Sequence, residues 1–236
     1  MVARAAADRA TEPDPRSGYA GGVIVVIGSP AGAQTGTDVS GAGLPVTIAA
    51  AAAAEARPVQ LIGRVGDDPT ADAVVLDLAR RGIGHVALLR DAAHATPMAS
   101  VPLLVDDPAS DEASDEAPDP VGLPLDAEDV DLGLRYLTGF DVLVLAAASE
   151  SPMVRVVADA AGWAGARLVV VVPAGARPST DLPGTAMVLE APPADPDGAF
   201  GRLVGRLAAS LDGGTEPEAA LRGALVPDGW ATATPD

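Results

Sequence analysis

Cysteine and lysine are both absent from the 236-residue chain, and aromatic residues make up only 3% of it. Without cysteine there are no disulfides, thiolate metal sites or cysteine nucleophiles. Without lysine there is neither a Walker-type P-loop nor Schiff-base chemistry. His85 and His94 are the only histidines. Two histidines are too few for a histidine-rich metal site, so we predict ordinary polar positions for both and no metal site.

Positive charge is also scarce, and the formal net charge is −18. Such a chain repels nucleic acid and anionic membranes, so we expect neither as a partner. No apolar run approaches the ~20 residues of a membrane span. Residues 1–20 are interrupted by charges and prolines and have no apolar core, so they do not form a signal peptide. We therefore predict a disordered tail at 1–20 and a cytoplasmic protein.

Small aliphatic side chains dominate the hydrophobic 48% of the chain, which suits helices packed on a parallel sheet. Short apolar runs alternate with helical segments along the sequence. This alternation predicts right-handed βαβ units and an α/β fold with a mostly parallel sheet covered by helices on both faces. The predicted strands are 21–28, 58–63, 85–90, 98–105, 141–147, 167–173 and 185–191; the predicted helices are 44–56, 69–81, 127–139, 151–165, 198–211 and 216–225.

A strongly acidic segment divides the chain near its middle. Residues 106–120 carry seven acids and no base, a composition typical of a solvated, mobile loop. The spacing of these acids does not match a calcium-binding loop. We place the acidic loop at 106–124, a single domain at 21–226, and a C-terminal tail at 227–236.

The sequence "PVQLIGRVGDDPTADAVVLDLARRGIG" begins the segment 58–105, which resembles the N-terminal part of the ribokinase, or PfkB, carbohydrate kinases. Residues 63–68 match that family's GRVGDD pattern in order. Residues 140–178 and 198–225 are similar to later elements, so the resemblance covers about 22–225. It implies a three-layer ribokinase-like fold with a small β lid, which we assign to 85–105. It also implies ATP-dependent phosphorylation of a sugar or nucleoside, and a homodimer formed through the lid strands.

The family's catalytic pattern is Asp-Thr-x-Gly-Ala-Gly-Asp, whose last Asp is the base. Aligning this pattern on Ala199 places Gly198 at the position of the base, and Asp195, Pro196 and Asp197 at the Gly-Ala-Gly positions. Proline has no N–H to donate, and two carboxylates put negative charge where the family binds phosphate. A one-residue shift would make Asp197 the base. In the other interpretation, Asp195 or Asp197 caps the following helix.

Residues that the resemblance implies for substrate and cofactor are only partly present. Ala33 stands where the family has a sugar-binding Asp, and Thr47 stands where it has an Asn. Thr47 either donates a hydrogen bond to a ligand or only occupies the first turn of its helix. The remaining candidates are Gly41, Gly43, Gly66 and Asp67 for substrate binding, and Asp195 and Glu190 for cofactor binding.

Three hypotheses follow from this pattern. The first is a ribokinase-like protein that has lost phosphoryl transfer and acts as a binding or interaction module for a small sugar or nucleoside. The second is a divergent carbohydrate kinase with Asp197 as base, and only this one requires ATP and Mg²⁺. The third is a vestigial product of a shortened gene.

Overall fold

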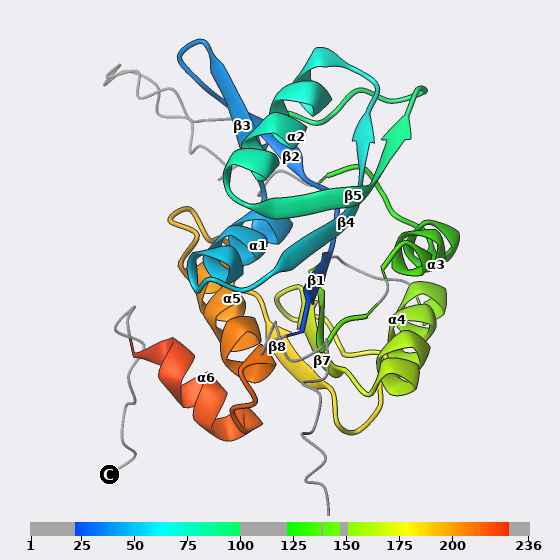
Figure 1. The fold of residues 1–236 in the computed structure, drawn as a ribbon, viewed down its shortest axis with the longest axis vertical. Coiled ribbons are helices and arrows are strands. Elements are labelled where there is room, and N and C mark those ends of the chain that lie inside the picture. Colours follow the sequence, from blue (N-terminus) through cyan, green and yellow to red (C-terminus); the bar gives the residue numbers. More distant parts are fainter. Residues whose placement is uncertain (1–21, 100–121, 138, 147–150, 227–236) are drawn as a thin grey trace, which may run out of the picture.

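A six-stranded parallel β-sheet forms the centre of the computed structural model, which describes residues 22–99, 122–137, 139–146 and 151–226 (Figure 1). The strands lie in the order β5-β4-β1-β6-β7-β8, so the chain winds outward from β1 in both directions. The predicted tails at 1–20 and 227–236 and most of the acidic loop lie outside the described residues. The strands are β1 (Ile24–Ile27), β4 (Val59–Gly66), β5 (Ile83–Asp91), β6 (Val142–Leu145), β7 (Arg167–Val172) and β8 (Met187–Glu190).

Helices cover both faces of the sheet, as the alternating strands and helices predicted. In β1, Ile24 and Val26 join an apolar cluster with α1, α5 and α6, whereas Val25 and Ile27 join a second cluster with α3 and α4. The two groups of helices lie on opposite sides of β1 in Figure 1. The predicted fold class is therefore confirmed. The helices are α1 (Leu44–Ala54), α2 (Pro69–Arg80), α3 (Ala127–Arg135), α4 (Ser151–Ala164), α5 (Ala199–Asp212) and α6 (Pro217–Leu225).

The small second sheet is formed by a segment that we did not predict to be strands. It is an antiparallel pair, β2 (Ala31–Thr35) and β3 (Asp38–Ala42), joined at Gly36, which has a positive φ of 63°. The predicted lid strand 85–90 lies instead in β5, which pairs in parallel with β4 at one edge of the main sheet. The assignment of the lid to 85–105 stays a prediction. Of the other predicted lid strand, only Met98 and Ala99 are described, and Met98 forms a single bridge with Gly32.

Glycines on α5 allow an unusually close approach to the alanine-rich helix α1. A Cβ atom added at Gly205 would lie 2.5 Å from Ala51 Cβ and 2.5 Å from the carbonyl oxygen of Ile48. At Gly201 an added Cβ would lie 2.7 Å from Thr47 Cγ2. Real Cβ atoms need more than 3 Å, so the two helices meet at a distance that only glycine permits. This contact fixes the start of α5 relative to the start of α1.

A buried carboxylate at the C-terminal end of α5 gives the protein one unfavourable ionised group. The side chain of Asp212 is fully buried, and its Oδ2 lies 3.2 Å from Arg57 Nη1. Desolvation raises the pKa of Asp212, and nearby Asp141 raises it further, although Arg57 and the Gly22 N–H act in the opposite direction. Folding therefore favours the protonated form of Asp212.

The pH dependence of stability should change when Asp212 can no longer ionise. The pKa of Asp212 is higher in the folded state than its unfolded value of 3.8. The contribution of Asp212 to the free energy of unfolding is therefore largest below pH 3.8 and is lost as pH rises through the folded pKa. Asp212→Asn should remove that loss. Urea unfolding measures the free energy of unfolding at pH 4 and at pH 7. Between these two pH values, the free energy of unfolding of the variant should rise more, or fall less, than that of the wild type. Equal changes in the two proteins would contradict this assignment.

Candidate functional site

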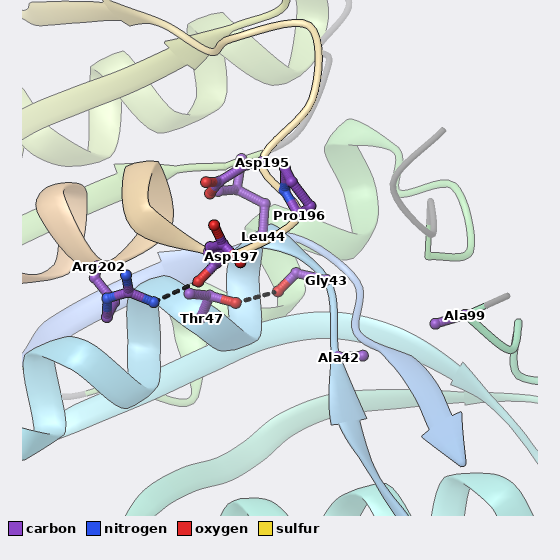
Figure 2. Close-up of a pocket in the computed structure, with 10 residues that line it drawn as sticks. Ala42, Gly43, Leu44, Thr47, Ala99, Asp195, Pro196, Asp197 and Arg202 are labelled. Carbon is purple, nitrogen blue, oxygen red and sulfur yellow. Dashed lines mark hydrogen bonds between the residues drawn. The ribbon is translucent and has the colours of Figure 1, made fainter. Parts of the chain in front are cut away.

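A pocket of about 390 Å³ lies between the start of α1 and the turn that precedes α5 (Figure 2). Both helices begin on the side of the sheet where the parallel strands end, which is the usual location of ligand sites in such sheets. The pocket is lined by Ala42, Gly43, Leu44, Thr47, Ala99, Asp195, Pro196, Asp197, Gly198 and Arg202. Five of the predicted site residues are among them: Gly43, Thr47, Asp195, Asp197 and Gly198.

Asp195 caps α5 from outside the helix. Its Oδ1 accepts a hydrogen bond from the Phe200 N–H at 3.1 Å, and its Oδ2 accepts one from the Gly201 N–H at 3.0 Å. The free N–H groups of a first helical turn form a natural anion site, because they point outward at the positive end of the helix dipole. One carboxylate of the chain itself therefore occupies two of these donors, which agrees with the capping interpretation for Asp195.

Gly198 forms the junction between this turn and α5. It is the N-cap residue in a left-handed conformation (φ 66°), and its N–H donates to the carbonyl oxygen of Asp195 at 3.0 Å. A side chain is strained in this conformation, so the glycine is required by the backbone. With no side chain at all, Gly198 can neither accept nor donate a proton. If the protein has a base at this place, Gly198 is not that base.

Asp197 and Arg202 form the polar rim of the pocket. The Arg202 guanidinium donates to the backbone carbonyl oxygen of Asp197, as the dashed line in Figure 2 shows. The Asp197 side chain is exposed, and within the described chain its carboxylate accepts no hydrogen bond. Arg202 was not among our predicted site residues. Its position one turn after Gly198 is the only sequence signal that could have indicated it.

Thr47 faces Asp197 across the pocket but is engaged by its own helix. Its hydroxyl donates to the carbonyl oxygen of Gly43 at 3.3 Å (Figure 2). Its methyl group packs against Gly198 and Gly201. This geometry agrees with the interpretation in which Thr47 occupies the first turn of its helix. The hydroxyl oxygen can still accept a hydrogen bond from a ligand.

Four predicted site residues do not line this pocket. Gly41 lies in β3 and donates its N–H to Asp77 Oδ2 on α2 at 2.9 Å. Gly66 donates its N–H to the Thr96 hydroxyl, and the exposed Asp67 donates its N–H to the carbonyl oxygen of Asp91. Glu190, at the end of β8, accepts a hydrogen bond from the Gly175 N–H at 2.7 Å. Each of the four thus has a structural contact away from the pocket.

The GRVGDD segment that carries the resemblance stabilises the strand ends. Asp68 caps α2 through the Ala71 N–H and also accepts hydrogen bonds from the N–H and hydroxyl of Thr96. Partial desolvation acts to raise the pKa of Asp68, but these hydrogen bonds outweigh it and hold the pKa below its ordinary value. Arg64 binds both carboxylate oxygens of Asp129, at 2.6 and 2.7 Å. These ionic contacts were not predicted, since the partners are far apart in sequence.

The residues present do not fit the phosphate of a bound nucleotide at the start of α5. Asp195 accepts hydrogen bonds from the N–H groups of Phe200 and Gly201, Pro196 has no N–H to donate, and Asp197 adds a second negative charge. Within the described residues no group of three or more histidines and carboxylates could hold a metal ion. No helix among these residues is long and apolar enough to cross a membrane.

Comparisons with known proteins show which solved structures have a similar fold. No family model and no curated protein matches the chain. The crystal structure of Sa239 is similar, with a TM-score of 0.63 and 15% identity over 85% of this chain and 90% of that one. The structure of Arabidopsis thaliana ribokinase complexed with ribose and ATP has a TM-score of 0.61 and 15% identity over 86% and 90% of the two chains. The chain therefore has a ribokinase-like α/β fold.

Proposed function

We propose that this protein is a ribokinase-like binding module that holds a small polyhydroxylated ligand, such as a sugar or nucleoside, without transferring phosphate to it. The pocket between α1 and α5 is the binding site. Its size lies within the range typical of small-molecule sites. The ribokinase with a similar fold was crystallised with ribose and ATP, which supports a sugar as the class of ligand.

The cap formed by Asp195 is the observation that carries this proposal. Phosphoryl transfer depends on fixed hydrogen-bond donors that stabilise charge on the transferring group. In this chain a carboxylate already holds the donors of Phe200 and Gly201. A phosphate would have to displace that carboxylate and then lie next to it, at a large electrostatic cost. The site can bind hydroxyl groups, but it lacks the electrostatic preorganisation for phosphoryl transfer.

An active but divergent carbohydrate kinase is the second candidate function. The exposed carboxylate of Asp197 favours it, because an unpaired carboxylate at the rim of a pocket can accept a proton from a substrate hydroxyl. This candidate requires ATP and Mg²⁺, and it requires Asp195 to leave the N–H groups of α5 when nucleotide binds. The homodimer remains a prediction under either function.

Incubation with ATP, Mg²⁺ and a panel of sugars and nucleosides separates the two functions. We expect no phosphorylated product above the level without protein. We also expect at least one compound of the panel to raise the melting temperature without ATP, because a ligand that binds only the folded state stabilises it. Turnover that disappears in Asp197→Asn would establish the kinase instead. A cooperative melt that no compound shifts would argue against binding in this pocket.

A further inference from the structure

The groove between α3 and α4 carries the most exposed large apolar side chain among the described residues. Trp163, near the end of α4, is 91% exposed. The chain has only two tryptophans. A tryptophan side chain that is exposed on a monomer contributes none of the hydrophobic stabilisation that its burial would provide. An exposed aromatic side chain beside a groove is typical of an interaction site. This face lies on the opposite side of the sheet from the pocket at α5 (Figure 1).

The groove beside Trp163 has an apolar floor, and its charged side chains are one ion pair and one further carboxylate. Its volume is about 550 Å³, and its floor includes Leu134 of α3, Val156 of α4, and Phe140, which precedes β6. Asp131 and Asp159 stand on its two sides, one on each helix, and Arg135 is its one basic residue. Arg135 forms an ion pair with Asp131 one turn earlier. Asp159 lies one turn before Trp163 on α4, is exposed, and forms no ion pair within the described chain.

The charge of this face indicates which kind of partner can bind to it. A second copy of the chain also carries a net charge of −18, so long-range repulsion opposes its approach to this face. A cationic side chain, in contrast, is attracted to this face. It can lie on the indole face of Trp163, where cation–π attraction is strongest, while Asp159 neutralises its charge.

We propose that the α3–α4 groove docks a basic segment of a partner protein, with an arginine or lysine side chain on Trp163 beside Asp159 and neighbouring apolar side chains in the groove. This interaction surface is independent of the pocket at α5. It gives a protein without phosphoryl transfer a second way to act, through binding to another protein.

A short fluorescein-labelled peptide of alternating arginine and glycine tests the proposal by fluorescence anisotropy at physiological ionic strength. Trp163→Leu, which keeps an apolar side chain but loses the aromatic face, should weaken binding about tenfold, whereas Trp163→Phe should keep most of it. Asp159→Asn should weaken binding severalfold. Glu218→Gln removes the same charge from exposed α6 on the other side of the sheet and should have no comparable effect.

Two results would overturn this assignment. If Asp159→Asn and Glu218→Gln weaken peptide binding equally and Trp163→Leu leaves it unchanged, the peptide responds only to the overall negative charge. If sedimentation shows a wild-type dimer that Trp163→Leu converts to a monomer, the groove is covered by a second copy instead. Trp163 is so exposed that its replacement should leave the melting temperature unchanged, so lost binding in a folded variant is interpretable.

Discussion

Replacing Gly205 with alanine should destabilise the protein by about 3 kcal/mol, the upper part of the range for overpacking a core. The added Cβ would lie 2.5 Å from the carbonyl oxygen of Ile48 and 3.0 Å from the backbone nitrogen of Ala52. Both atoms belong to the backbone of α1 and cannot move aside by a change of rotamer. The two helices must therefore separate, and the contacts around them are lost along the whole interface. Urea unfolding monitored by circular dichroism measures this loss.

Gly162→Ala is the matched control for this prediction. Gly162 also lies inside a helix, α4, but apart from its own helix backbone and chain neighbours no described atom lies within 4 Å of the position of its added Cβ. Alanine has a higher helix propensity than glycine, so this substitution should stabilise the protein by about 0.5–1 kcal/mol. Opposite signs for the same chemical change would show that helix packing, rather than propensity, decides the effect at Gly205. A loss below about 1 kcal/mol at Gly205 would mean that α1 and α5 are farther apart than the structure shows.

The main sheet was predictable because its elements have strong local signals. Asp68 followed by Pro69 marks the start of α2, and Gly82, with a positive φ of 73°, follows its end. Runs such as 24–27 are buried on both faces and have no polar alternation. Patterns of this kind depend on neighbours in the sequence and on burial, so they can be read without coordinates.

The small sheet was not predictable from the same signals. β2 and β3 read AGAQT and DVSGA, and Val39 is their only large apolar residue, so neither strand shows alternation of apolar and polar residues. The hairpin is held by its pairing and by α2, where Asp77 accepts the Gly41 N–H. In contrast, the apolar run in 85–90 indicated a strand correctly but could not show which strand it pairs with. Pairing is a property of the whole fold.

The site was predictable in its location and not in its contacts. The alignment with the family pattern brought Asp195, Asp197 and Gly198 to the start of a helix, and the structure places all three at one pocket. Which carboxylate caps the helix could not be derived from the sequence, since both precede Gly198 within three residues. The turn formed by the Gly198 N–H and the Asp195 carbonyl oxygen brings Asp195 back to the helix and leaves Asp197 exposed.

Asp195→Ala should destabilise the protein and at the same time create an anion site. The substitution leaves the N–H groups of Phe200 and Gly201 without their present partner. Loss of a helix cap of this kind costs about 1–2 kcal/mol. The freed donors can then bind an inorganic anion at the positive end of α5. We expect phosphate to raise the melting temperature of Asp195→Ala more than that of the wild type, compared with chloride at equal ionic strength.

Asp197→Ala is the control that isolates the cap from the charge. It removes the same negative charge from the same turn, but its carboxylate accepts no hydrogen bond within the described chain. Its unfolding free energy should therefore change by less than about 0.5 kcal/mol, as for other surface substitutions, and its response to phosphate should stay close to that of the wild type. If both variants gained the same response, general electrostatic repulsion would be the cause. If neither variant gained any response, the N–H groups of α5 would not form an anion site when Asp195 is removed, and the proposal that this protein does not transfer phosphate would lose its main support.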